Sequence, residues 1–193
     1  MYDTYLPFTS HEPMRSPRII VVTGIQAAGK STVARMLAQR FGRGVHIEAD
    51  VLQQMIVSGG EWITEPGVIS EEAGCQLRLR LHNASLLARS FLEAGFTPVV
   101  DDIIIGERYD QLKSELPGVP FEVIVLAPSP DLVAIKRDAG RGKRVLGEKW
   151  ARYLDHALRQ TMAGEGMWVD SGDQTPEETV EEIIRRLALR ATA

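Results

Sequence analysis

The chain has 193 residues, 44% of them hydrophobic and 25% charged, which suits a single domain with a sizeable core. Its net charge of −4 argues against nucleic acid as a main partner, because phosphate backbones are met by clustered Lys and Arg. The single cysteine, Cys75, cannot form a disulfide within the chain, and no apolar run reaches the roughly 18 residues that span a membrane. We therefore expect a cytoplasmic protein in which Cys75 is a packed or idle thiol.

The first half of the chain alternates apolar runs with helical patterns. Prolines among polar residues predict an irregular arm over residues 1–17, followed by one domain over 18–193. Short β-branched runs predict buried strands, and apolar residues at helical spacing predict helices. The expected elements are a strand at 18–23, a helix near 29–41, a strand at 45–49 and a helix near 51–57. The Gly- and Pro-rich residues 58–70 predict a loop or a flap over a substrate.

The second half continues the alternation. Strands are expected at 97–101, 121–126 and 167–170. A long helix is expected at 71–94, and further helices at 107–115, near 130–137, near 148–162 and at the end of the chain. An Arg- and Gly-rich segment at 138–147 separates the helices near 130–137 and 148–162. Thr175 is expected to cap the last helix, with Pro176 and two acids in its first turn. This alternation predicts an α/β three-layer fold with a five-stranded parallel sheet.

The turn after the first strand fits the Walker A pattern at every fixed position. Its residues are Gly24, Ile25, Gln26, Ala27, Ala28, Gly29, Lys30, Ser31 and Thr32. Such a loop directs backbone N–H groups and a helix N-terminus at phosphates, so we expect it to bind ATP with Mg²⁺. Lys30 is expected to reach the β- and γ-phosphates, and Ser31 to bind the metal. A glycine turn that matches by chance is the alternative, but the strand before it and the helix after it argue against that.

Two acidic sites follow neighbouring strands. Asp101 and Asp102 end the third strand, where a phosphate-loop enzyme needs a carboxylate to hold Mg²⁺; both are candidate metal ligands, or else solvated or capping acids. Asp50 follows the second strand, and ligands of open α/β sheets bind at the carboxyl ends of strands. We therefore expect Asp50 to be the catalytic base for an attacking hydroxyl, with capping of the next helix as the alternative.

Three arginines and two lysines, with two glycines among them, gather at residues 136–144 and overlap a predicted lid at about 138–147. Arg137 and Arg141 are the best candidates to stabilise the transferring phosphoryl group, and Arg137 also to contact the nucleotide. A solvated basic loop is the alternative. Arg78 and Arg80 lie on the long helix and are expected to be solvated. Trp62 and Ile63 are equally compatible with an acceptor pocket and with a core.

Together these residues resemble the chloramphenicol phosphotransferase-like family of P-loop kinases, within the nucleoside-monophosphate-kinase-like group. The resemblance spans most of the chain from Arg18 onward. It rests on the Walker A loop, Asp50 in Glu-Ala-Asp-Val-Leu, the Val-Val-Asp-Asp-Ile-Ile-Ile-Gly segment that ends at Gly106, and the basic lid. It implies a sheet order of 2-3-1-4-5, Asp50 as the base, and stabilisation of the phosphoryl group by Lys30 and the lid arginines. Residues 58–70 depart from the antibiotic kinase, which leaves the acceptor open.

Three functions remain from the sequence. The favoured one is a small-molecule phosphotransferase that acts on a hydroxyl, such as that of an antibiotic or another small alcohol. The second is a nucleotide or polynucleotide 5′-hydroxyl kinase, which needs arginines that reach an acceptor phosphate. The third is an ATP-dependent switch with slow hydrolysis and a protein partner. The sequence leaves open whether the protein is a monomer or a homodimer.

Overall fold

Five parallel strands form the centre of the protein in a computed structural model that describes residues 17–133 and 146–191. The strands are β1 (Ile19–Gly24), β2 (Gly44–Glu48), β3 (Thr97–Asp101), β4 (Phe121–Leu126) and β5 (Met167–Val169). Their order in the sheet is β2-β3-β1-β4-β5, as the family resemblance implies. The predicted arm at 1–17 lies outside the described residues except for Pro17, and so does most of the predicted lid.

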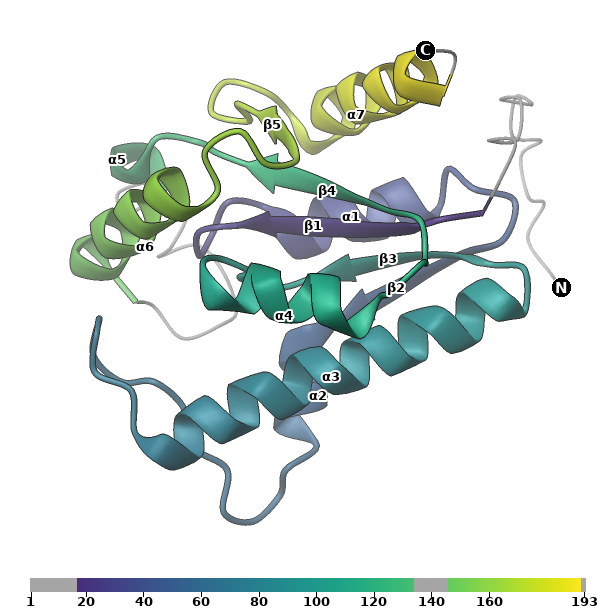
Figure 1. Cartoon of the computed structure of the whole chain (residues 1–193). Coiled ribbons are helices and arrows are strands. Elements are labelled where there is room, and N and C mark those ends of the chain that lie inside the picture. Colours follow the sequence, from purple (N-terminus) through teal and green to yellow (C-terminus); the bar gives the residue numbers. More distant parts are fainter. Residues whose placement is uncertain (1–16, 134–145, 192–193) are drawn as a thin grey trace, which may run out of the picture.

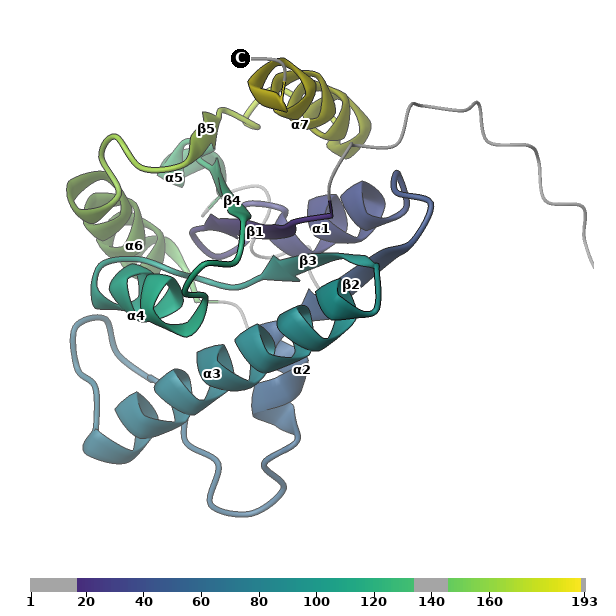
Figure 2. The ribbon, with the colours of Figure 1, turned by 45° about the vertical axis from the view of Figure 1, so that its right-hand side comes forward.

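Helices cover both faces of this sheet. They are α1 (Lys30–Ala38), α2 (Ala49–Gln54), α3 (Glu71–Glu93), α4 (Glu107–Glu115), α5 (Pro130–Leu132), α6 (Glu148–Thr161) and α7 (Pro176–Ala191). Figures 1 and 2 show α1 with α7 on one side of the sheet and α3 with α4 on the other. The three-layer α/β architecture predicted from the sequence is therefore confirmed. None of the helices in the described ranges is long and apolar enough to cross a membrane.

The central strand β1 is buried along its whole length, and residues 19–22 are fully inaccessible. It pairs in register with β3 on one side and β4 on the other, so both of its edges and both of its faces are covered. A strand in this position must be apolar throughout, which explains its run of Ile and Val. Because the strands are parallel, their carboxyl ends meet at one edge of the sheet, and the loops that follow them converge there.

Capping side chains set where two helices begin. The Ser70 hydroxyl accepts a hydrogen bond from the backbone N–H of Ala73 at 3.1 Å and so starts α3. The Thr175 hydroxyl accepts from the N–H of Glu178 at 3.2 Å, while the Glu178 carboxylate accepts from the N–H of Thr175 at 2.8 Å. This reciprocal pair is a capping box, and it confirms the predicted start of α7.

Several predicted boundaries in the first half of the chain differ from the structure. The second strand ends at Glu48, and α2 begins at once with Ala49, two residues earlier than expected. Ala49 is fully buried, so packing favours an immediate turn into the helix, and Asp50 then lies in the first helical turn, where the helix dipole favours an acid. The helix expected at 29–41 ends at Ala38, and of the helix expected at 130–137 only the start lies within the described residues.

A close backbone approach at Gly44 yields a test of the fold. A Cβ atom at Gly44 would lie 1.8 Å from the carbonyl oxygen of Ala38, whereas a Cβ at Gly42 would meet nothing within 4 Å. We expect Gly44→Ala to lower the free energy of unfolding by roughly 2 kcal/mol or more, because backbone must move to relieve the clash. Gly42→Ala is the matched control and should change it by less than about 0.5 kcal/mol. Urea unfolding measures both, and equal effects would contradict this packing.

Tyr109 of α4 yields a test by pH. Burial, the 2.9 Å hydrogen bond from its hydroxyl to Glu165, and the charges of Glu165 and Asp110 raise the pKa of Tyr109 to about 12. A pKa above the unfolded value of about 10 stabilises the fold fully below pH 10, and that stabilisation is lost as the pH rises through 12. We expect Tyr109→Phe to flatten the fall of unfolding free energy between pH 10 and 12. Tyrosinate absorbance should show one late-titrating tyrosine in the wild type that the variant lacks.

Candidate active site

The turn between β1 and α1 has the shape of an anion cradle. Gly24, Ala27 and Gly29 take positive φ values of 147°, 54° and 94°, which turn successive N–H groups toward the inside of the loop. A Cβ atom at Gly24 would lie 2.3 Å from the carbonyl oxygen of Leu126, so the start of the loop is pressed against β4. A Cβ at Gly29 would meet nothing within 4 Å, which leaves room beside the helix N-terminus.

A charged residue and two hydroxyl residues of the Walker A loop follow Gly29 at the start of α1. The Lys30 ammonium donates a hydrogen bond to the carbonyl oxygen of Ile25 at 2.9 Å, so its charge lies across the loop. Ser31 and Thr32 follow in the first turn of α1, which is described in full and contains no acidic side chain. Backbone N–H groups of the loop, the helix dipole and an ammonium suit the phosphates of a nucleotide, so these residues fit the predicted ATP.

The paired aspartates at the end of β3 face opposite sides of the sheet, as neighbouring strand residues do. Asp101 contacts the Nε2 atom of His46 at 3.2 Å, and His46 lines a hollow together with α1 residues such as Arg35. Asp101 therefore lies on the face that α1 covers. Asp102 points to the other face, where it meets α3 and α4. Of the pair, Asp101 thus lies on the face of the sheet that is covered by α1, the helix that contains Ser31.

The carboxylate of Asp102 is buried and saturated with donors. Its Oδ1 atom accepts from Arg80 at 2.5 Å and from the N–H of Ile103 at 2.7 Å, and its Oδ2 atom accepts from Arg108 at 2.6 Å. Burial alone would raise the pKa of Asp102, but the charges of Arg108 and Arg80 and the hydrogen bonds outweigh it and lower the pKa below its ordinary value. Asp102 is therefore ionised and neutralised by its neighbours.

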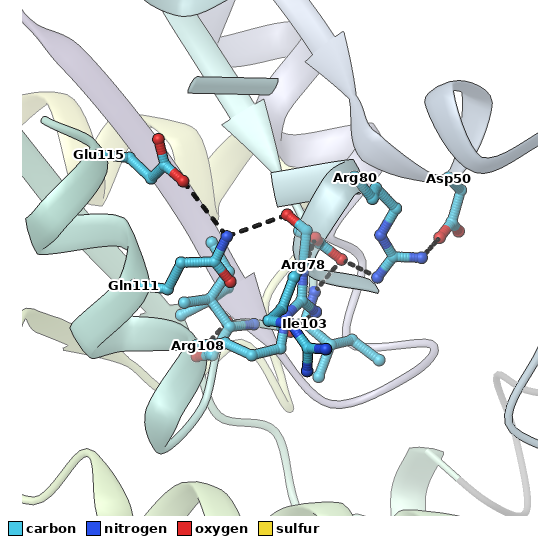
Figure 3. A network of polar contacts seen from close by, with 10 residues as sticks. Asp50, Arg78, Arg80, Ile103, Arg108, Gln111 and Glu115 are labelled. Carbon is cyan, nitrogen blue, oxygen red and sulfur yellow. Dashed lines mark hydrogen bonds and ion pairs between the residues drawn. The ribbon is translucent and has the colours of Figure 1, made fainter. Parts of the chain in front are cut away.

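Asp50 belongs to the same cluster of charges. Its Oδ1 atom lies 3.4 Å from Nη1 of Arg80, and Figure 3 shows the two side chains pointing toward each other, from α2 and α3. The Asp50 side chain is 39% exposed, whereas that of Arg80 is 6% exposed. The structure thus places the predicted base at the edge where the strands end and links it through Arg80 to Asp102, one of the two predicted metal aspartates. The expectation that Arg80 is solvated is wrong, because α3 turns this position toward the carboxyl ends of the strands.

Buried amides attach the flap, residues 58–70, to α2 and α3. The Oε1 atom of Gln76 accepts from Gln53 Nε2 at 3.0 Å and from the N–H of Glu61 at 2.8 Å, and its Nε2 atom donates to the carbonyl oxygen of Gly59 at 2.7 Å. These two glutamines were not singled out by sequence reasoning. The spacing of Gln76 and Arg80, four residues apart on one helix, was the available signal.

The flap encloses a hollow of about 410 Å³ that is lined in part by Trp62, Ile63 and Val68. Trp62 is 47% exposed and Val68 63% exposed, so these side chains are not core residues. The tip of the flap reaches α6, since a Cβ at Gly67 would lie 3.6 Å from the ring of Tyr153. The core interpretation of Trp62 is therefore wrong, and the acceptor pocket stays a prediction.

The other residues singled out in the sequence lie apart from the charged cluster around Arg80 or outside the described residues. Arg137 and Arg141 lie outside the described residues. Gln26 of the Walker A loop is buried and donates to the carbonyl oxygen of Gly147 at 3.4 Å, which joins the loop to the start of α6. Arg78 is exposed and donates to the Sγ atom of Cys75 at 3.0 Å. Cys75 is exposed as well.

Comparison with known proteins identifies the family. Residues 19–160 match the model of AAA_33, described as an AAA domain. The chain belongs to this family of P-loop kinases. It is 30% identical over 171 residues to a Thermococcus kodakarensis protein named "Putative adenylate kinase", covering 86% of this chain and 83% of that one. The kinase-type nucleotide site expected from the Walker A loop thus agrees with the family, and the narrower chloramphenicol phosphotransferase-like group stays a prediction.

Solved structures share the fold of this kinase-family chain. A gluconokinase from Sinorhizobium meliloti 1021 superposes with a TM-score of 0.64 at 23% identity, covering 92% of this chain and 95% of that one. Thymidylate kinase from Candida albicans superposes with a TM-score of 0.67 at 14% identity, covering 91% and 92%. At these identities the likeness shows the fold alone.

The saturated Asp102 yields a test of the site's stability. We expect Asp102→Asn to lower the free energy of unfolding by about 3 kcal/mol or more, because it removes the buried counter-charge that Arg108 and Arg80 share. The control is Asp110→Asn, which removes an exposed carboxylate paired with Lys113 and should cost less than about 1 kcal/mol. Thermal and urea unfolding measure both variants. A similar loss in the two would mean that the buried cluster contributes no more than a surface pair.

Proposed function

We propose that this kinase-family protein transfers the γ-phosphoryl group of ATP to a hydroxyl of a small molecule, with Mg²⁺ and with Asp50 as the base. The observation that carries the proposal is the place of Asp50. Its half-exposed carboxylate lies at the edge where the parallel strands end, which is also where the Walker A loop opens. A hydroxyl nucleophile needs a proton acceptor at that place.

Different groups of the chain are proposed to bind the phosphates and the magnesium ion. The loop N–H groups and Lys30 would hold the β- and γ-phosphates, and Mg²⁺ would neutralise the charge that develops on them. Ser31 and Asp101 are the proposed magnesium ligands. Asp101 is a better candidate for a magnesium ligand than Asp102, because the carboxylate of Asp102 already accepts hydrogen bonds from two arginines and a backbone N–H. Arg137 and Arg141 remain proposed to stabilise the transferred group.

The proposed reaction accounts for the bond formed, the bond broken and the proton released. The acceptor oxygen forms a bond to the γ-phosphorus while the bond from that phosphorus to the bridging oxygen of ADP breaks. The acceptor's proton passes to the carboxylate of Asp50, and ADP leaves with the bonding electron pair. We propose that the body of the acceptor lies in the flap hollow against Trp62 and Ile63. An antibiotic or another small alcohol with an apolar body suits such a lining.

A nucleoside monophosphate is the second candidate acceptor, because the relative from Thermococcus kodakarensis is named as an adenylate kinase. This acceptor carries a phosphate, which needs a cation to bind it. Arg80 and Arg108 are both paired with Asp102, and Arg78 is the exposed arginine on that part of α3. Among the described residues, the charge balance near Asp50 therefore supports a neutral alcohol over a phosphate-bearing acceptor.

Turnover against a panel of acceptors tests the proposal. We would measure magnesium-dependent ADP release with amphenicols, other antibiotics, sugars, nucleosides and nucleoside monophosphates. We expect one neutral hydroxyl compound to raise turnover, Lys30→Ala to abolish it, and Asp50→Asn to lower kcat by about 10²-fold or more, which is the contribution of a general base. Asp173→Asn, which changes an exposed carboxylate between β5 and α7, is the control and should leave kcat unchanged.

Three results would contradict parts of this proposal. Strong turnover with a nucleoside monophosphate and none with neutral alcohols would favour the second candidate. Unchanged acceptor phosphorylation by Asp50→Asn would place the base elsewhere. Slow hydrolysis that no acceptor stimulates, with a protein partner retained only in the ATP state, would favour a switch.

A further inference from the structure

Arg80 carries a positive charge that is almost fully withdrawn from water. Its side chain is 6% exposed. In the sequence of α3, Arg80 stands between the exposed Leu79 and the buried Leu81. A guanidinium in such a place needs anionic partners, because the loss of hydration is otherwise too costly. Arg80 has two: one terminal nitrogen lies 2.5 Å from Asp102 and the other lies 3.4 Å from Asp50. The side chain therefore bridges two carboxylates that come from different elements.

The two sides of this bridge differ in strength. Asp102 is fixed by Arg108 and by the N–H of Ile103, and Arg108 also donates to the carbonyl oxygen of Ile103 at 2.5 Å. This end of the bridge is buried, short and held by several bonds, so it anchors the guanidinium. The other end is one longer contact to a half-exposed carboxylate. Arg80 is thus held by Asp102 and presents its second nitrogen to Asp50.

A second polar contact runs parallel to this one. Gln76 and Arg80 lie four residues apart on α3 and share one face, and Asp50 and Gln53 lie three residues apart on α2. The pairs Gln53–Gln76, at 3.0 Å, and Asp50–Arg80, at 3.4 Å, therefore connect the same two helices one turn apart. Because α2 has only six residues, side-chain contacts to α3 rather than its own length fix its rotation. Its rotation in turn sets the direction in which the Asp50 carboxylate points.

A base must be oriented without being neutralised. A short bidentate pair with arginine would make a carboxylate a poor proton acceptor, because both oxygens would already be satisfied. The contact from Arg80 is longer, at 3.4 Å, and reaches one oxygen of Asp50. Arg80 therefore contacts this carboxylate without forming a short bidentate pair with it, and Asp102 compensates most of the charge of Arg80.

We propose that Arg80 is a positioning residue for phosphoryl transfer, which holds the Asp50 carboxylate toward the acceptor oxygen while Asp102 and Arg108 hold Arg80. This inference rests on the proposed role of Asp50. It requires the fork of a guanidinium, whose nitrogens reach two carboxylates at once. A lysine at this position keeps the charge beside Asp102 and loses the contact to Asp50.

The test is a double-mutant cycle with water as the acceptor, since water is always present and needs no identified substrate. We would compare the wild type, Asp50→Asn, Arg80→Lys and the double variant by the kcat and KM of magnesium-dependent ATP hydrolysis. The same rates would be measured with any hydroxyl compound that stimulates turnover. Binding of a fluorescent ATP analogue and thermal unfolding accompany each variant. Arg89→Lys is the matched control, because Arg89 is a half-buried arginine on α3 that donates to the backbone of Glu115.

We expect Arg80→Lys to lower kcat by about 10- to 100-fold, because a misplacement of about 1 Å in a catalytic group can cost 10² in rate. The KM for ATP and the affinity for the analogue should stay within about twofold, since Arg80 contacts no Walker A residue in the described structure. The double variant should be no slower than Asp50→Asn, because Arg80 acts through that carboxylate. Arg89→Lys should keep the wild-type kcat.

Each alternative result has a distinct meaning. Additive losses in the double variant, or a wild-type kcat in Arg80→Lys while Asp50→Asn is slow, would overturn the positioning role and leave the proposed base in place. A lower melting temperature of Arg80→Lys with unchanged kcat per folded protein would show that the bridge is structural only, which also overturns the proposal. A wild-type rate in Asp50→Asn would overturn the base of the proposed function, and the positioning role with it.

Discussion

The carboxylate of Asp102 lies between α3 and α4 and accepts hydrogen bonds from two guanidiniums and one backbone N–H. Three elements depend on it: the end of β3, where it originates, α3 through Arg80, and α4 through Arg108. An ionised carboxylate in a buried place is stable only while these donors stay, and the donors are stable only while it stays ionised. This mutual dependence fixes the geometry of the carboxyl edge of the sheet, against which Asp50 is then oriented.

The Walker A loop and the flap are built on opposite principles. The loop is formed by backbone, with glycines and an alanine at positive φ, and Lys30 completes the cradle from the start of α1. The flap, where we propose that the acceptor lies, is held by buried amide side chains and carries exposed apolar residues around a hollow. A backbone loop recognises the phosphates that nucleotides share, whereas side chains set the choice of acceptor. The family relationship therefore supports nucleotide binding and does not identify the acceptor.

Charge balance distinguishes the possible acceptors more sharply than shape does. Among the described residues, Asp50 and Asp102 face Arg80 and Arg108, so these four charges cancel. An additional anionic group on the acceptor would need a cation beyond these. A neutral alcohol, the acceptor that we propose, would add no charge and leave this cluster unchanged. The same cancellation explains how two arginines can lie in a partly buried place.

The sequence alone determined the elements, the layers and the nucleotide loop, because periodicity, capping residues and the Walker A spacing are local signals. The bounds of β3, α4 and β4 follow from such signals, and so does the capping box at Thr175. Tertiary structure alone decided the partners of the charged residues. Helical periodicity does not show that position 80 faces two carboxylates, one 30 and the other 22 residues away in the chain, or that Asp102 is turned from the nucleotide face. Such contacts form only when segments that are distant in the sequence pack against each other. The packing therefore decides which partner neutralises each buried charge.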